Sequence, residues 1–496
     1  MGLIIRQSIK NTLISYVGIA LGFVSTILLF PRILTPDEYG LTRLLFSIAL
    51  VCSQFAHLGV RNIIIRFFPY FSHSEASRGR FFSFALAISL VGFILFCILF
   101  LLTDELFIHS FRDQSELFTE YYLFLIPLVL AVLFYEVLNN YIRALHDAVT
   151  GSLVHEIVLR SSLIVLLVVF YFDFITFPVF MVGFVLCYSL EPILLLAYLW
   201  YIGELNIEFP RLKKRTKFLK GIANYGGYAL LGGLSTLIVN KIDIIMLGAM
   251  LDLESTAVYA IAFYVGNVIA VPQASIAKIA MPVLAGLIKN KEWPGIESLY
   301  ERTSLNQIIA GVLLYIGIWA NMHNLMDILP PEYRGVKWII LTVGFSKLFD
   351  MATGINGGII LNSKYYRFDL YTKIFLVIIA VATNYYFIPI YGILGAAIAT
   401  TISIILYNSI KLFFVWIVFS IQPFRVNSLL IMGLATACLL LSFQLPYLQN
   451  FFIDVVIRSA AITIVFIGSI LLFNLSDDIK ILVQESLLNI QAFFSS

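Results

Sequence analysis

Long apolar runs without alternation are the feature of this sequence that most restricts its fold. One of them, ALAISLVGFILFCILFLL, fills residues 85–102 without a charged side chain. A helix needs about 20 mostly apolar residues to cross the hydrocarbon of a bilayer, where its backbone must satisfy its own hydrogen bonds. Strands of membrane barrels alternate in polarity and are about ten residues long, so these runs indicate helices. We therefore expect an all-α polytopic membrane protein.

The composition is that of a protein whose surface faces lipid. Charged residues make up 12% of the sequence and hydrophobic residues 60%, whereas soluble domains carry about 25% charged residues. The net charge is +3 and no basic arm is present, so we expect no nucleic-acid partner. The four cysteines all lie in apolar runs, and we expect neither disulfides nor a metal site: Cys52, Cys97, Cys187 and Cys438.

We expect fourteen membrane spans, and their connections alternate in charge. One set of connections holds 21 Lys and Arg residues and the other holds 5. The positive-inside rule therefore predicts that both termini are cytoplasmic, and the even number of spans agrees. Apolar residues at helical spacing after the last span predict an amphipathic tail on the inner surface. The predicted spans are 11–30, 40–58, 81–102, 119–138, 151–172, 178–202, 224–248, 256–284, 303–320, 338–360, 370–388, 393–420, 428–446 and 456–474.

A short sequence segment near the N-terminus is repeated in the middle of the chain; we call it the repeated phrase. YVGIALGFVST at residues 16–26 corresponds to YGGYALLGGLST at residues 225–236 if one residue is inserted. An even number of spans separates the copies, so the two halves run parallel, as in transporters with parallel repeats. The alternative is generic packing of small residues. Both copies carry residues that let helices pack closely: Gly18, Gly22, Gly227, Gly232 and Gly233.

The most basic stretch, PRLKKRTKFLKG at residues 210–221, separates the two sets of six spans. We interpret it as a linker between lobes; a topology anchor, or a contact with anionic lipid, is the alternative. The predicted parts are an N-terminal six-helix lobe at 1–205, a basic cytoplasmic linker at 206–222, a C-terminal six-helix lobe at 223–422, and two extra transmembrane helices with the tail at 423–496.

Over essentially its whole length the chain resembles the flippases for lipid-linked oligosaccharides. These belong to the multidrug/oligosaccharidyl-lipid/polysaccharide superfamily, with the MATE multidrug exporters and the peptidoglycan lipid flippase. The order and spacing of five segments carry the resemblance: ILTPDEYGL (33–41), LGVRNIIIRFFPYF (58–71), YIRALH (141–146), DIIMLGAMLDLESTAVY (243–259) and YGILGAAIAT (391–400).

This resemblance implies a fold and a substrate. The fold is a V-shaped pair of six-helix lobes, related by a pseudo-two-fold axis along the membrane normal, with two extra C-terminal helices. The substrate is an undecaprenyl-diphosphate-linked oligosaccharide, a repeat unit of O-antigen, capsule or exopolysaccharide, moved across a bacterial inner membrane by alternating access. The implied partners are this lipid, membrane lipids and the polysaccharide polymerase machinery. A MATE-like multidrug antiporter and a membrane glycan polymerase are the alternatives.

Ionisable side chains inside spans are costly and are therefore candidates for function. A diphosphate requires cations, and Lys278 lies between Pro272 and Pro282 in a helix expected to line the cleft. We interpret Lys278 as a cation of the substrate site. The alternative is a lysine that snorkels, or that is ion-paired, near the inner face.

Three arginines of the second span and its inner end are further candidates. Arg43 lies near the outer end of that span, and Arg61 and Arg66 follow its inner end. Each offers a planar fork that suits phosphate. The alternatives are an interfacial anchor for Arg43 and topology signals for Arg61 and Arg66.

Two further pairs of charged residues, and one single glutamate, lie inside spans. Lys241 and Asp243 are neighbours in sequence but do not share a helix face, so we expect partners on other helices. Asp350 follows Lys347 by three residues and could pair with it. Glu191 precedes a proline in mid-span. Glu191 and Asp350 are the candidates for ion coupling, with protons, sodium or the membrane potential alone left open.

Signatures of catalysis are missing from the sequence. There is no GxxxxGK[ST] phosphate loop, so ATP hydrolysis is not expected. The six histidines lack the spacing of a zinc site. Glycan polymerases carry a large outer loop, whereas the outer loops near 103–118 and 321–337 are short. We therefore expect a transporter that is not an enzyme and uses no cofactor.

Overall fold

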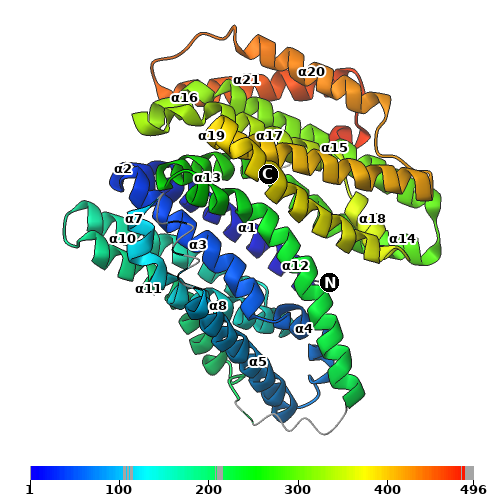
Figure 1. Cartoon of the computed structure of the whole chain (residues 1–496). Helices are drawn as coiled ribbons and strands as arrows, with labels where there is room; N and C mark the ends of the chain where they lie inside the picture. Colours follow the sequence, from blue (N-terminus) through cyan, green and yellow to red (C-terminus); the bar gives the residue numbers. More distant parts are fainter. Residues whose placement is uncertain are drawn as a thin grey trace, which may run out of the picture. The chain divides into compact units, whose positions relative to one another are not determined.

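The computed structural model describes residues 2–103, 105, 108, 111, 115–206, 208, 216–481 and 483–485, and these form helices and turns without a strand (Figure 1). The prediction of an all-α membrane protein is confirmed. Residues 210–215 of the predicted linker, and the tail after residue 485, lie outside the described residues. The chain forms two compact units, 1–260 and 261–496. The predicted division into two six-helix lobes stays a prediction.

In the N-terminal unit, short stretches of another helical type interrupt several of the α-helices. Two of these stretches are π-helical turns, η1 and η4. Its helices are α1 (Gly2–Phe23), η1 (Val24–Leu29), α2 (Phe30–Ile33), α3 (Pro36–Ala56), α4 (Val60–Phe67), η2 (Phe68–Tyr70), α5 (Glu75–Leu102), α7 (Glu116–Tyr121), η3 (Tyr122–Phe124), α8 (Leu125–Ala144), α9 (Val149–Leu153), η4 (Val154–Leu159), α10 (Arg160–Tyr171), α11 (Phe177–Tyr201) and α12 (Thr216–Met250).

The boundary between the units falls inside α13 (Leu253–Val268). The C-terminal unit continues with α14 (Val271–Asn290), α15 (Trp293–Ala320), α16 (Met322–Ile328), η5 (Pro331–Val336), α17 (Lys337–Ala352), α18 (Asn356–Asn362), α19 (Tyr366–Phe419), α20 (Val426–Ser442) and α21 (Phe451–Leu472).

Eleven helices of the described residues are long and apolar enough to cross a membrane, or twelve if the bent pair formed by Pro331–Ala352 and Asn356–Asn362 is one span. The predicted count of fourteen is not confirmed. The first seven predicted spans correspond one to one to helices, from Lys10–Ile33 to Lys220–Met250. The predicted continuous span over 256–284 is wrong, because it is divided between α13 and α14. Pro272 in the first turn of α14 explains the break, since proline suits a helix start but not a helix interior.

Two segments of the resemblance, ILTPDEYGL at 33–41 and the part MLDLESTAVY at 250–259, each begin a helix with a side-chain cap. Thr35 N–H donates to Glu38 Oε2 at 2.9 Å, and Glu38 N–H donates to Thr35 Oγ1 at 3.3 Å. Asp252 Oδ1 accepts a backbone N–H of α13 at 2.6 Å. Such caps satisfy N–H groups that the first turn leaves without partners. The motifs also touch, because a Cβ on Gly40 would lie 1.9 Å from the carbonyl oxygen of Leu253.

The small residues of the repeated phrase meet different surroundings. A Cβ on Gly18 would lie 2.3 Å from the carboxylate of Glu156, and one on Gly233 would lie 2.3 Å from Gln54 Nε2. No heavy atom of the described residues lies within 4 Å of a Cβ built on Gly227 or Gly232. The repeat therefore supplies close packing at two of its glycines and open space at two others.

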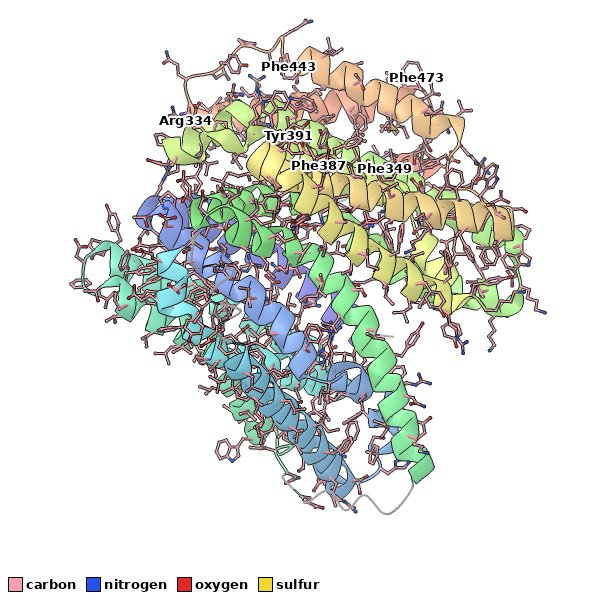
Figure 2. All side chains as sticks on the ribbon, viewed as in Figure 1. Arg334, Phe349, Phe387, Tyr391, Phe443 and Phe473 are labelled. Carbon is pink, nitrogen blue, oxygen red and sulfur yellow. The ribbon has the colours of Figure 1, made fainter. Side chains whose placement is uncertain are left out.

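Helix α19 runs for 54 residues, which at about 1.5 Å per residue far exceeds the hydrocarbon thickness of about 30 Å. It reverses direction at Gly392, whose backbone is not helical (φ 57°, ψ −136°). Thr383 Oγ1 lies 3.1 Å from Ser403 Oγ, so the two arms run antiparallel. The rings of Phe387 and Tyr391 stack beside the turn (Figure 2). The arms correspond to the predicted spans 370–388 and 393–420.

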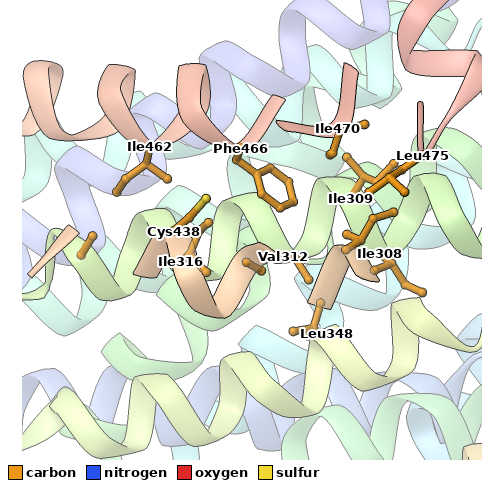
Figure 3. Close-up of a cluster of buried hydrophobic side chains, with 13 residues drawn as sticks. Ile308, Ile309, Val312, Ile316, Leu348, Cys438, Ile462, Phe466, Ile470 and Leu475 are labelled. Atoms are coloured by element: carbon orange, nitrogen blue, oxygen red, sulfur yellow. The ribbon is translucent and has the colours of Figure 1, made fainter. Parts of the chain in front are cut away.

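Helices α20 and α21 pack against α15, as Figure 1 shows. Their shared core contains Phe466 and Ile470 of α21, Cys438 of α20 and Val312 of α15 (Figure 3). Burial of such side chains, at about 25 cal/mol per Å² of apolar surface, holds helices together in water but not in lipid, where close packing and polar contacts decide.

Polar clusters attach α21 near its start and the segment that follows its end. At one end, Asp454 Oδ2 of α21 accepts from Asn324 Nδ2 at 2.6 Å and lies 3.0 Å from His323 Nε2. At the other end, Arg302 Nε of α15 donates to Asp478 Oδ2 at 3.3 Å. Asn306 Nδ2 donates to the same carboxylate at 2.7 Å. The hydrogen bond from Arg302 lowers the pKa of Asp478 below that of an ordinary carboxyl.

We predict that Gly392→Ala destabilises the protein. No heavy atom of the described residues lies within 4 Å of a Cβ built at this position, so we expect the cost to come from the backbone conformation, about 1–3 kcal/mol. Thermal unfolding in detergent should show a lower midpoint. Gly433→Ala in α20 is the matched control, because it is also free of contacts but is helical, where alanine is favoured. Equal midpoints for both variants would contradict the hairpin geometry.

Candidate functional site

Arg43 lies on α3 against two aromatic rings. Its guanidinium carbon is 4.6 Å from the centroid of Phe30 and 4.9 Å from that of Tyr39. Its Nη2 lies 3.5 Å from Thr26 Oγ1, and its buried Nε donates to no described residue. Tyr39 precedes Arg43 by four residues, which puts both on one face of α3. Rings attract a cation without neutralising it, so the guanidinium keeps its charge for an anion.

Lys241 of α12 meets the same face of α3 about one turn further along. Its Nζ lies 6.0 Å from the centroid of Phe46, which stacks on Tyr188 of α11 at 4.7 Å. Asp243, two residues later, is buried and accepts a hydrogen bond from the hydroxyl of Tyr259. Lys241 and Asp243 therefore contact different helices, as their spacing predicted.

The two arginines of α4 have different kinds of partner. Arg61 Nη1 lies 3.6 Å from Glu136 Oε2 of α8. The guanidinium carbon of Arg66 lies 4.2 Å from the ring centroid of Tyr225 and 5.8 Å from that of Phe67, and no described carboxylate pairs with it. Arg61 thus belongs to an ion pair, whereas Arg66 is a cation on an aromatic face.

Glu191 is buried in α11 at 2% exposure, immediately before Pro192. Its Oε1 lies 2.8 Å from Nδ1 of His155, which stacks on the ring of Tyr135. His155 is part of the π-helical turn η4, and such turns are frequent at functional sites. The pair joins a carboxylate and an imidazole that can share a proton inside a span. The sequence identified Glu191 but not His155, because the two lie on different helices.

Asp350 is held by amides of two other helices. Its Oδ2 accepts from Gln273 Nε2 at 3.1 Å, and its Oδ1 accepts from Asn408 Nδ2 at 2.8 Å. Lys347, three residues earlier, lies with Nζ 5.0 Å from the ring of Phe263. Among the described residues no three His, Cys, Asp or Glu side chains gather as a metal site would require.

Lys278 lies on the exposed face of α14, beside Ile279, which is 75% exposed. In the described part of the chain it has neither an ion pair nor a hydrogen bond. Only Ala280 and Leu284 of this helix are buried. The assignment of Lys278 to the substrate site stays a prediction.

A buried ion pair that the sequence did not reveal joins the two arms of α19. Lys411 Nζ lies 3.3 Å from Asp369 Oδ1 and donates to Tyr407 Oη at 2.9 Å. Lys373 Nζ lies 2.8 Å from the other oxygen of Asp369. Lys411 and Asp369 are each 5% exposed. Asp369 falls among the basic residues of a predicted inner loop, which is why its pairing with a lysine of the next span was missed.

One comparison with known proteins identifies a family for this chain. A sequence model of the family described as "Polysaccharide biosynthesis protein" matches residues 4–287. A search of curated proteins found no match.

Solved structures share the fold at low sequence identity. One is the lipid II flippase MurJ in an inward closed conformation, with a TM-score of 0.73 and 14% identity over 95% of this chain and 99% of that one. Another is a MATE family multidrug resistance transporter in an inward-facing conformation, with a TM-score of 0.63 and 16% identity over 84% of this chain and 98% of that one. At this identity the likeness establishes the fold alone.

We predict that Asp369→Asn destabilises the C-terminal unit strongly. It would leave Lys411 buried without a carboxylate, and removing one partner of a buried pair costs about 3–5 kcal/mol. The double variant Asp369→Asn with Lys411→Met should recover much of the loss. Thermal unfolding of both variants checks this. Lys373→Met is the control, because its side chain is 27% exposed; if it costs as much as Asp369→Asn, the buried pair is not what joins the arms.

Proposed function

Because the chain belongs to the polysaccharide biosynthesis protein family, we propose that it is a flippase for an undecaprenyl-diphosphate-linked oligosaccharide. It would move this lipid from the cytoplasmic to the outer leaflet of a bacterial inner membrane. The oligosaccharide would be a repeat unit of O-antigen, capsule or exopolysaccharide, passed on to the polymerase machinery. The fold shared with the lipid II flippase MurJ supports a lipid-linked substrate.

The observation that carries the proposal is the set of cations on aromatic faces. Arg43 and Arg66 have no carboxylate partner among the described residues and lie on rings. A diphosphate attracts such cations through charge-assisted hydrogen bonds. A multidrug exporter of cations would instead need uncompensated carboxylates. This favours an anionic lipid over the MATE-like alternative.

We propose alternating access without chemistry, with both termini cytoplasmic. A dianionic head group that leaves a negative-inside cell gains about 2.3 kcal/mol per charge for each 100 mV, if no cation accompanies it. Glu191 with His155, and Asp350 with its two amides, are the proposed positions for ion coupling. Lys278 and Lys241 complete the proposed set of cations. Asp243 belongs to the proposed site as a polar group, and it accepts a hydrogen bond from the hydroxyl of Tyr259.

Deleting the gene tests the proposed function. Lipid-linked repeat units should accumulate on the cytoplasmic leaflet, where an added glycosidase or lectin cannot reach them in intact spheroplasts. Resistance to cationic drugs should not change. Normal translocation with a loss of chain polymerisation would indicate the glycan polymerase, and a loss of drug resistance alone would indicate the multidrug exporter.

Variants of Lys278 test one residue of the site. Lys278→Ala should lower surface glycan roughly ten- to a hundredfold, the loss expected for one charge-assisted hydrogen bond. Lys278→Arg should retain more transport than Lys278→Gln, because the charge matters more than the length of the side chain. Surface glycan is measured against protein level. Full transport by Lys278→Gln at equal expression would mean that Lys278 only snorkels.

A further inference from the structure

Four arginines follow α3 on the predicted inner side, and one of them, Arg66, differs from the others in its partners. Arg66 has no carboxylate partner among the described residues, although it is exposed and lies close in sequence to the others. An arginine whose charge is not needed for an ion pair is available for a ligand. The remaining three pair with glutamates: Arg61 with Glu136 at 3.6 Å, Arg78 with Glu204 at 2.8 Å and Arg80 with Glu208 at 3.5 Å.

The guanidinium of Arg66 lies over an aromatic ring. Its carbon is 4.2 Å from the ring centroid of Tyr225, and that ring meets Phe67 edge-on at 5.9 Å. The side chain of Arg66 is exposed, and none of its N–H groups donates to a described residue. A guanidinium in this state can bind two oxygens of a phosphate through its planar fork.

Glycines bring Tyr225 to this position. A Cβ on Gly226 would lie 2.8 Å from Ile63 Cδ1 of α4, so α12 and α4 pack closely here. A Cβ on Gly59, the N-cap of α4, would lie 2.3 Å from the carbonyl oxygen of Gly226, and Gly59 has φ 79°. Tyr16 is the counterpart of Tyr225 in the repeated phrase, yet it is 62% exposed. The tyrosine of the second copy therefore has a role that the first copy does not share.

We propose that Arg66 and Tyr225 form a preorganised site for the phosphate of a lipid head group, in which Arg66 binds and Tyr225 is a positioning residue. Fixing the fork before binding removes part of the ordering cost that binding would otherwise carry. Ile65 and Tyr70 beside it are 52% and 67% exposed, as residues at a lipid interface are. That the lipid is the transported diphosphate rests on the proposed function. A bulk anionic phospholipid offers the same chemistry.

Binding to the full chain in nanodiscs of zwitterionic phosphatidylcholine tests the site, with farnesyl diphosphate as the probe. Arg66→Gln should weaken binding about ten- to a hundredfold, the effect of one or two charge-assisted hydrogen bonds. Arg66→Lys should bind more weakly than the parent protein, because an ammonium has no planar fork. Tyr225→Leu should weaken binding several-fold, whereas Tyr225→Phe, which keeps the ring, should restore it.

Two variants serve as matched controls. Arg143→Gln removes an exposed arginine from the same unit, and Tyr16→Leu removes the counterpart tyrosine; neither should change the affinity. Thermal unfolding is recorded for every variant, and the exposed Arg66 can be replaced without a loss of packing. Unchanged affinity in Arg66→Gln, or equal losses in Tyr225→Leu and Tyr225→Phe, would overturn the proposal.

Competition by phosphatidylglycerol in the nanodisc identifies the source of the phosphate. Farnesyl diphosphate that binds without competition supports the transported lipid, and equal competition supports a site for any phosphate head group. If the parent protein binds phosphatidylglycerol through Arg66 but never the diphosphate, the site stands and the proposed substrate is wrong. If it binds the diphosphate and Arg66→Gln binds it equally well, the flippase proposal stands and this site does not.

Discussion

A charge in hydrocarbon needs a partner, and the polar organisation of both units follows from that cost. The partners are of three kinds. Lys411 has the carboxylate of Asp369, and Asp350 has two amides. Arg43 has aromatic rings, and so does Arg66 beyond the inner end of its span. A carboxylate neutralises the charge of a lysine, whereas an aromatic ring attracts a cation without neutralising it. This difference separates charges that build the fold from charges that can bind.

Much of the fold could be predicted from the sequence, because lipid leaves the backbone few choices. The first seven spans, the caps at Thr35 and Asp252 and the two arms of α19 all follow from apolar runs and local turn residues. The break before Pro272 was missed. A hydropathy pattern does not reveal a break when both sides of it are equally apolar. The number of spans depends on such breaks.

The candidate site was less predictable for a different reason. The cost of burial shows which residues matter, such as Arg43 and Glu191, but their partners depend on which helix faces meet. Tyr39 could have been found, since it lies four residues before Arg43 on one helix. His155 and Tyr225 could not, because each belongs to a helix distant in sequence from the group that it contacts.

The attachment of the last two helices has a mechanical consequence. Helix α21 is attached to α16 near Asp454 at its start, and the segment that follows its end is attached to α15 near Asp478. Both helices also pack against α15, so they cannot swing as a separate arm. Any displacement of α15 must carry them along. Their outward faces are apolar, with Phe452 and Leu429 at 77% and 71% exposure. Lipids in contact with these faces would therefore move with the C-terminal unit. The viscosity of the bilayer would then slow the motion of that unit.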